Sequence, residues 1–173
     1  ARFDEAANIG LATRLQQAGV TVVYGIVNYK THAKVLLIVR REDGRLRRYV
    51  HLGTGNYHSI TTQFYCDFSY LTGNEQIGQD VHNVFMQLTG LGLPAPMNKL
   101  LMSPFTLMDR TVAMIDREVE HAKAGSPARI VAKVNALTEG RIIEALYRAS
   151  QAGVQVDLIV RGICCLRPGV PGV

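Results

Sequence analysis

The sequence predicts an α/β fold, with a mixed sheet flanked by helices in one domain, followed by the start of a second, similar domain. Three observations lead to this prediction. Segments with apolar residues at helical spacing alternate with short apolar runs that are typical of strands. Asp43-Gly44 lies between two such runs and is a strong signal for a two-residue hairpin, which joins antiparallel strands. Near the end of the chain, the order strand, helix, strand predicts a β-α-β unit and therefore parallel strands.

The first half of the chain is expected to form one helix and then four strands. Residues 4–18 carry apolar side chains on one stripe, and Gly19 ends that helix. Strands are expected over residues 20–27, 33–41, 45–52 and 64–71, the last with Tyr65 and Asp67 on one face.

A second group of elements follows. Thr72-Gly73-Asn74-Glu75 resembles a capping box and predicts a helix with an apolar stripe over residues 77–88. The Gly- and Pro-rich stretch 90–96 is typical of a linker, so we expect a boundary near residue 98 and domains over 1–98 and 99–173. Beyond the boundary we expect a long helix over 108–122, then a strand, a helix and a strand over 129–134, 142–152 and 154–160.

Two segments echo each other. Residues 16–20 and 150–154 both end a helix with Ala-Gly-Val, and a strand is expected after each. If the echo is a duplication, the second half should carry its own histidine motif after its second strand. No histidine follows Arg161, so we expect the second domain to be truncated at its C-terminal end and the first at its N-terminal end.

Composition favours an anionic partner. The formal net charge is +5 and the pI about 9.3, which suits a nucleotide, nucleic acid, polyphosphate or an acidic membrane surface, although many basic proteins bind nothing in particular. No apolar run reaches the roughly 20 residues that span a bilayer. The three cysteines show no metal-ligand spacing, so reduced, buried thiols in the cytosol are expected.

The strongest candidate site combines two motifs. Lys30-Thr31-His32-Ala33-Lys34 places His32 and Lys34 on one side of an extended segment, and Gly53-Thr54-Gly55-Asn56 returns nearby with backbone N–H groups and an amide. Flanking lysines should lower the pKa of His32 and leave a ring nitrogen able to attack phosphorus. A surface histidine beside an ordinary hairpin connection is the alternative. The other histidines are expected to be structural, solvent-exposed or on polar helix faces: His51, His58, His82 and His121.

Arginines supply a second set of candidates, because guanidinium groups pair with phosphate in a bidentate manner. Arg2 and Arg161 are candidates for anion binding, and Arg161 follows a predicted parallel strand, where ligands bind in open α/β sheets. For Arg47 and Arg48 a surface ion pair is favoured. A Walker loop and a kinase glycine-rich loop are both absent from the sequence.

These motifs carry a resemblance to a known family. The chain resembles the catalytic part of the large, multidomain type of bacterial polyphosphate kinase, through ARFDEAANI, KTHAK, RRYVHLGTGNY, residues 65–71, EHAKAGSPARI and YRASQAGVQVDLIVRGICCLRPGVPG. The resemblance covers essentially the whole chain. It implies a phospholipase D-like fold and reversible transfer of the terminal phosphate of ATP to polyphosphate.

The resemblance also implies roles for individual residues. His32 matches the histidine that becomes phosphorylated, while Lys34 and Asn56 match the lysine and asparagine of the phospholipase D pattern. Tyr65 and Arg161 match nucleotide-contacting positions, and Arg2 matches an arginine of the Mg²⁺-phosphate site. An arginine cannot be an ordinary Mg²⁺ ligand, so Arg2 is expected to bind the phosphate that carries the ion.

For the whole enzyme, the resemblance implies ATP, ADP and polyphosphate as partners, no specific nucleic acid, and a homo-oligomer. It implies a cytoplasmic protein and allows peripheral attachment to the inner membrane. The family's second active-site histidine and its N-terminal and helical domains are missing from this sequence, so weak or no activity is expected of the chain alone.

Two other functions remain open from the sequence. A phospholipase D-like phosphodiesterase would use the same histidine, but Val39 stands where that pattern has an acidic residue. A non-catalytic module that binds polyphosphate or nucleic acid is also compatible with the basic charge, although the absence of tryptophan disfavours base stacking.

Overall fold

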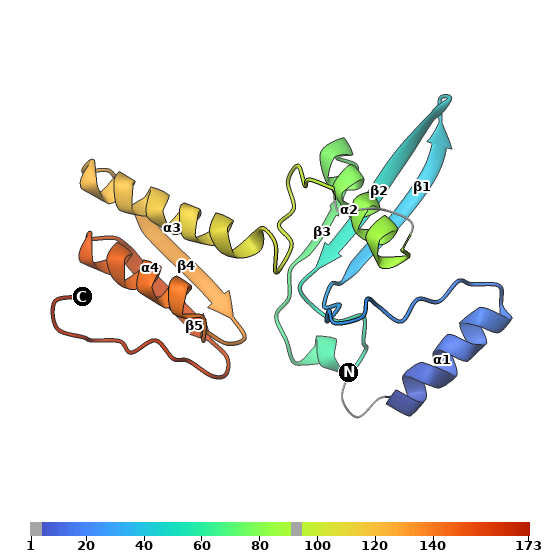
Figure 1. The fold of residues 1–173 in the computed structure, drawn as a ribbon, viewed down its shortest axis with the longest axis horizontal. Helices are drawn as coiled ribbons and strands as arrows, with labels where there is room; N and C mark the ends of the chain where they lie inside the picture. Colours follow the sequence, from blue (N-terminus) through green and yellow to red (C-terminus); the bar gives the residue numbers. More distant parts are fainter. Residues whose placement is uncertain (1–4, 91–94) are drawn as a thin grey trace. The chain divides into compact units, whose positions relative to one another are not determined.

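The computed structural model describes residues 5–90 and 95–173 and shows a mixed α/β protein, which confirms the predicted class (Figure 1). The chain divides into two compact units, Ala1–Leu100 and Leu101–Val173. The first unit contains α1 (Glu5–Gln17), β1 (Val35–Glu42), β2 (Arg45–Gly53), the 3₁₀ turn η1 (Thr61–Gln63), β3 (Ser69–Thr72) and α2 (Glu75–Leu88). The second contains α3 (Leu107–Lys123), β4 (Arg129–Val134), α4 (Gly140–Gln151) and β5 (Gln155–Val160).

The predicted hairpin is present and fixes the sheet of the first unit. Asp43 and Gly44 have φ values of 48° and 76°, the left-handed conformation that a tight hairpin turn requires at both central positions. The turn places Glu42 opposite Arg45, and the register runs to Val35 opposite Leu52. Strand β3 pairs antiparallel with the other edge of β2, so the strand order is β1-β2-β3.

Helix α2 begins where the sequence predicts, but its cap is a different residue. The side chain of Asn74 accepts hydrogen bonds from the backbone N–H groups of Gln76 (3.0 Å) and Ile77 (3.1 Å). The capping-box reading, with Thr72 as the cap, is wrong because Thr72 still belongs to β3 and pairs with Val50. Its hydroxyl instead accepts from the N–H of Asn74 at 3.1 Å.

Helix α2 packs on β1 and β2 and closes the small core of the first unit. Val50 and Val81 are 2% and 1% exposed. The helix comes closest to the sheet at Gly78, where an added Cβ would lie 2.9 Å from the Cβ of Arg48. Glycine is therefore required here by the close approach of helix and strand.

A buried carboxylate fastens the segment after α2 to that helix. Asp80 is fully buried, and its oxygens accept from the backbone N–H groups of Asn98 (2.8 Å), Lys99 (2.7 Å) and Leu100 (2.9 Å) and from the Asn98 side-chain amide (2.8 Å). Burial by itself would raise the pKa of Asp80, but these hydrogen bonds hold it below its ordinary value.

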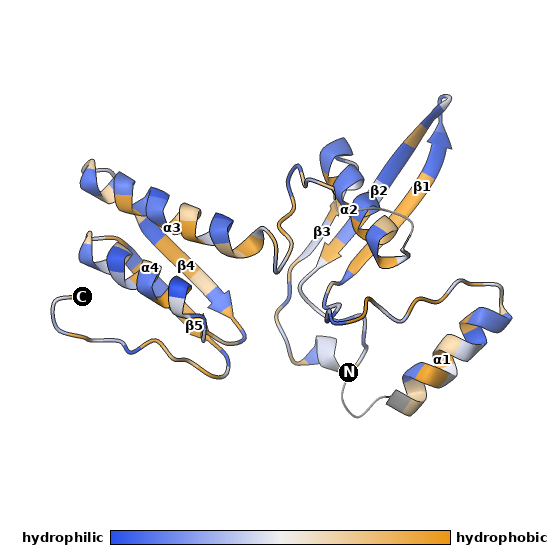
Figure 2. Cartoon of the chain, in the orientation of Figure 1, coloured by the Kyte–Doolittle hydropathy of each residue, from blue (hydrophilic) through white to orange (hydrophobic). Residues whose placement is uncertain are grey.

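The second unit has the predicted β-α-β order. Strands β4 and β5 are parallel, with Arg129 opposite Gln155 and Val134 opposite Val160. Helices α3 and α4 pack against each other, and α4 contacts β5 while α3 contacts β4. The buried core contains residues at helical spacing on both helices, together with Leu137 and Val154 from the connecting segments; the helical residues are Ile115, Val119, Ala145, Leu146 and Ala149. Hydrophobic residues accordingly dominate the middle of β4 (Figure 2).

The two echoed segments form the same helix end. In each, the glycine has a positive φ, 82° at Gly19 and 89° at Gly153. The N–H of Val20 donates to the carbonyl of Leu15, and that of Val154 to the carbonyl of Ala149, both at 3.0 Å. Such six-to-one bonds around a left-handed glycine are typical of a Schellman helix end, so the sequence echo is also a structural one.

The strand expected over residues 20–27 is not formed. Its backbone contributes only an isolated bridge between Ile26 and Tyr29, whereas the equivalent segment after Gly153 is β5 and pairs with β4. A strand needs a neighbour to satisfy its backbone groups, and within the described residues none lies beside 20–27. Helix α1 is present as expected, but Leu11 and Leu15 on its apolar stripe are exposed.

The strand expected over 64–71 is shorter and begins later. β3 starts at Ser69, opposite Gly53, and β2 ends at Gly53, so residues before Ser69 have no ladder partner. Tyr65 and Asp67 therefore lie in irregular backbone, and the expectation that they share a strand face is wrong.

The expectation of buried thiols is also wrong. Cys66, Cys164 and Cys165 are free and exposed, because all three lie in connecting segments outside the two cores. Among the described residues, no helix has the length and apolar character needed to cross a membrane.

Candidate functional site

The side chains of His32 and Lys34 meet just before β1. Both precede Val35, the first residue of β1, and Lys34 Nζ is 2.8 Å from His32 Nε2. A lysine ammonium can only donate, so Nε2 accepts this bond and the ring hydrogen belongs on Nδ1. The arrangement marks Nε2 as a basic nitrogen with a cation beside it, in an exposed position.

The charges around His32 favour its neutral form. The pKa of His32 is lowered, mainly by the positive charge of Lys34, then by partial burial and by the charge of Lys30. A neutral imidazole keeps a lone pair that can attack an electrophile near neutral pH.

The glycine-rich turn begins directly beside Lys34. The N–H of Gly53 donates to the carbonyl of Lys34 at 2.9 Å, which continues the β1–β2 ladder by one residue. A Cβ added to Gly53 would lie 3.3 Å from His51 Cε1 and 3.8 Å from Lys34 Cβ. Gly53 thus lets the turn pass close to these two side chains, on the face of the sheet that carries Lys34.

Asp67 organises the rest of the turn. Thr54 donates from its hydroxyl to Asp67 Oδ1 (3.1 Å), and the backbone N–H of Phe68 donates to the same hydroxyl oxygen (2.9 Å). The N–H of Thr54 in turn donates to the Phe68 carbonyl at 3.0 Å. A side chain at Gly55 would collide with the Asp67 carboxylate, so Gly55 is needed for this contact.

The remaining site candidates lie in different parts of the chain. Asn56 ends the turn, is exposed, and its side-chain amide has no hydrogen bond within the described residues. Tyr65 lies half-exposed in the segment between η1 and β3. Arg161 directly follows β5 in the second unit and donates its N–H to the carbonyl of Val134 at 3.0 Å. Arg2 lies outside the described residues.

His51 lies next to the candidate site, and the sequence analysis did not predict this location. Its Nδ1 is 2.6 Å from the Tyr57 hydroxyl and its Nε2 is 2.5 Å from Ser69 Oγ. The hairpin register could have located it, because counting back from Glu42 opposite Arg45 puts His51 opposite Leu36, on the same strand face as Lys34.

The predicted surface ion pair is present at Arg47 but not at Arg48. Arg47 forms the expected ion pair, with its Nε 3.8 Å from Glu42 Oε2. The ion-pair prediction for Arg48 is wrong: its stem packs against Gly78 and its buried Nε has no partner among residues 5–90 and 95–173, because α2 covers this position of β2.

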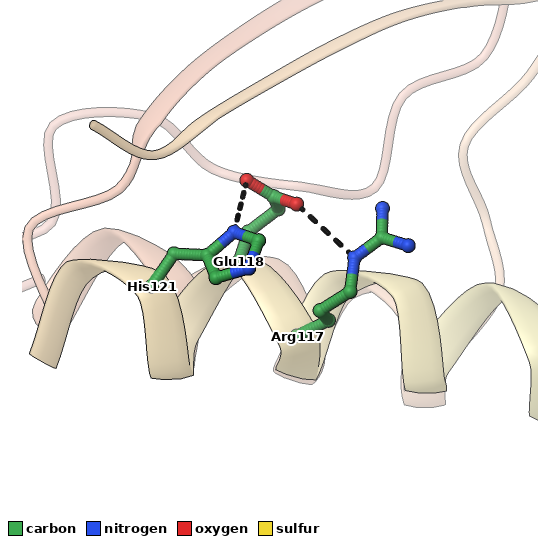
Figure 3. A network of polar contacts seen from close by, with 3 residues as sticks. All are labelled: Arg117, Glu118 and His121. Atoms are coloured by element: carbon green, nitrogen blue, oxygen red, sulfur yellow. Dashed lines mark hydrogen bonds and ion pairs between the residues drawn. The ribbon is translucent and has the colours of Figure 1, made fainter. Parts of the chain in front are cut away.

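The remaining helical histidines have ordinary surroundings. His121 Nδ1 lies 3.4 Å from Glu118 Oε2, and Arg117 Nε lies 3.4 Å from the other oxygen of that carboxylate (Figure 3). Partial burial would raise the pKa of Glu118, but the hydrogen bond to His121 and the neighbouring groups hold it below its ordinary value. His82 is half-buried in α2.

The described part of the chain does not fit a metal ion held by protein ligands. Within residues 5–90 and 95–173, no three or more His, Cys, Asp or Glu side chains form a cluster that could hold one.

Comparison with protein families gives two matches that together cover most of the chain. The model described as polyphosphate kinase C-terminal domain 1 matches residues 1–94, and that of polyphosphate kinase C-terminal domain 2 matches residues 100–173.

Individual relatives give the same result. The chain is 63% identical over 173 residues to a polyphosphate kinase of Xylella fastidiosa and 61% identical over 172 residues to one of Neisseria gonorrhoeae. These matches cover 100% and 99% of this chain but 25% of each relative, so the chain spans about a quarter of their length. The crystal structure of polyphosphate kinase from Porphyromonas gingivalis superposes with a TM-score of 0.85 and 38% identity, over 99% of this chain and 29% of that one.

Proposed function

Because this chain belongs to the polyphosphate kinase family, we propose that it carries the nucleophile for reversible transfer of the terminal phosphate of ATP to polyphosphate, and that this nucleophile is His32. The observation that supports this most is the 2.8 Å contact between His32 Nε2 and Lys34 Nζ, beside the glycine-rich turn that begins at Gly53. A basic nitrogen, a cation and a turn rich in backbone N–H groups then occur together.

In the first half-reaction, His32 Nε2 attacks the γ-phosphorus of ATP. The N–P bond forms, the P–O bond to ADP breaks, and ADP leaves with the bonding electrons. Lys34 must release Nε2 for the attack, and its ammonium can then pair with a phosphoryl oxygen as negative charge shifts onto the leaving group. In the second half-reaction, a terminal oxygen of polyphosphate attacks the same phosphorus and the N–P bond breaks.

The other residues have supporting roles in this proposal. Asn56 offers its amide to the phosphoryl oxygens, since that amide has no hydrogen bond to the described residues. Tyr65 and Arg161 contact the nucleotide, and Arg2 binds the phosphate to which Mg²⁺ is attached; these three assignments rest on the family pattern. The partners are ATP, ADP and polyphosphate. A cytoplasmic location, peripheral attachment to the inner membrane and assembly into a homo-oligomer are part of the same family-based proposal.

The phosphodiesterase alternative has less support. Val39, where the phospholipase D pattern has an acidic residue, lies within β1 opposite Arg48, so this position does not supply the carboxylate of that pattern.

The test is transfer of label from γ-labelled ATP to protein, trapped as acid-labile, base-stable phosphate. We expect labelling of the full-length Xylella fastidiosa relative to disappear when the histidine equivalent to His32 is replaced by alanine. The same substitution, His32→Ala, is made in this chain, with His121→Ala as the matched histidine control. Labelling of the relative that survives loss of that histidine would contradict the proposal.

A further inference from the structure

A group of exposed arginines occupies the turn end of the β1–β2 hairpin, away from His32. We call Arg40, Arg41, Arg45 and Arg47 the arginine hairpin. All four are exposed, with 66% of the Arg40 side chain and 62% of the Arg47 side chain accessible to solvent. Figure 2 shows that this end of the hairpin is hydrophilic, whereas the middle of β1 is hydrophobic.

Two of these arginines face each other across the strands. Arg40 pairs with Arg47 in the register, and like charges directly opposite are destabilising in a sheet. A single carboxylate is shared between them: Glu42 lies 3.4 Å from Arg40 Nε and 3.8 Å from Arg47 Nε, and also accepts from the Tyr49 hydroxyl at 2.9 Å. One carboxylate therefore serves two guanidinium groups.

The other two arginines, Arg41 and Arg45, form no ion pair among the described residues, although Arg45 lies opposite Glu42 in the register. Arg41 pairs with Leu46 in the register, one position along from Arg40 and Arg47, so it projects from the opposite face of the hairpin. Positive charge is thus present on both faces of the turn end.

In the second unit, several basic residues form ion pairs with carboxylates of their own. Five of them each lie within 4 Å of a carboxylate: Arg117, Lys123, Arg129, Arg141 and Arg148. Figure 3 shows one such arrangement, around Glu118. In the arginine hairpin, by comparison, a single carboxylate is shared by two of the four arginines.

We propose that the arginine hairpin is a second polyanion-binding site that holds polyphosphate away from its reacting end. Guanidinium groups bind phosphate oxygens in a bidentate manner, and a polyphosphate chain offers many such groups in succession. Six residues of extended strand separate Lys34 from Arg40, a distance of about 20 Å. Only a long polymer can reach both places, so this site favours long chains over tripolyphosphate and ATP. The choice of polymer rests on the function proposed above.

The test measures binding of fluorescent long-chain polyphosphate to this chain as salt is raised from about 50 to about 200 mM. The test variant replaces all four arginines by glutamine: Arg40→Gln, Arg41→Gln, Arg45→Gln and Arg47→Gln. A matched variant removes four paired charges from the second unit: Lys123→Gln, Arg129→Gln, Arg141→Gln and Arg148→Gln. We expect the test variant to bind at least tenfold more weakly and with a salt slope smaller by roughly 3, if each lost phosphate contact contributes about 0.7 as in single-stranded nucleic acid. The matched variant should lose less than threefold.

The outcomes separate this site from the proposed catalytic site. Loss of polymer binding in the test variant with unchanged affinity for tripolyphosphate supports the arginine hairpin, whether or not His32 accepts phosphate. Equal losses in the test and matched variants would show a general charge effect and overturn the proposal. Binding of phosphatidylglycerol vesicles is measured with the same variants. If the vesicles bind through the four arginines and polyphosphate does not, the surface is a membrane contact and the proposal is wrong.

Discussion

Replacing Asp80 by asparagine should destabilise the first unit by about 4 kcal/mol. One carboxylate oxygen accepts from the backbone and side-chain amides of Asn98, and the other accepts from the N–H groups of Lys99 and Leu100. In Asp80→Asn one of these oxygens becomes an NH₂ group, so two donors lose their acceptor whichever way the amide is turned. Each costs about 2 kcal/mol at a site that is fully buried.

The assay is urea unfolding, with amide hydrogen exchange to locate the effect. We expect faster exchange at Lys99 and Leu100 in the variant. Asp116→Asn is the matched control, because Asp116 pairs with Arg148 on the surface, with 49% of its side chain exposed, and its loss should cost less than about 1 kcal/mol. Equal unfolding free energies for wild type and Asp80→Asn, with unchanged exchange at Lys99 and Leu100, would show that these hydrogen bonds do not stabilise the first unit.

The pH dependence of this effect has a definite sign. The pKa of Asp80 is lowered in the folded state, so the carboxylate stabilises the fold above its unfolded pKa, near 3.8. The stability difference between wild type and Asp80→Asn should therefore be constant near neutral pH. It should shrink only as the pH falls below about 3.8 toward the folded-state pKa.

Three further substitutions test other parts of the structure. Lys34→Met removes the main charge that lowers the pKa of His32, so that pKa, followed by NMR titration, should rise toward its ordinary value; an unchanged titration would contradict the contact. Gly55→Ala introduces a side chain against the Asp67 carboxylate and should displace the turn, seen as loss of its ordered amide signals, while Gly44→Asn should be tolerated at its positive φ. Val81→Ala should cost about 2 kcal/mol in urea unfolding, because Val81 is 1% exposed.

Local features of the fold could be predicted because they depend on neighbours in the sequence. Asp43-Gly44 fixes the hairpin and its register, and the Ala-Gly-Val segments fix two helix ends with the same hydrogen bonds. The parallel pairing of β4 and β5 follows from the helix between them. Each of these is decided within a few residues or within one supersecondary unit.

Features that need a distant partner could not be predicted. Residues 20–27 have the pattern of a strand, but only a neighbouring strand could make them one, and periodicity does not reveal its absence. The contact of Asp67 with Thr54 and Gly55 joins residues about a dozen positions apart through irregular backbone, so no spacing rule indicates it. The position of His51 could have been predicted, because the hairpin register alone places it on the same strand face as Lys34.

The central claim is that His32 accepts the phosphoryl group, and peptide mapping of the labelled protein tests it most directly. After incubation with Mg²⁺ and γ-labelled ATP, this chain and the full-length Xylella fastidiosa relative are digested under alkaline conditions that preserve phosphohistidine. We expect to find the phosphoryl group on the peptide containing His32 or its equivalent. Recovery of the label on another residue, such as His51 or His58, would show that His32 is not the nucleophile.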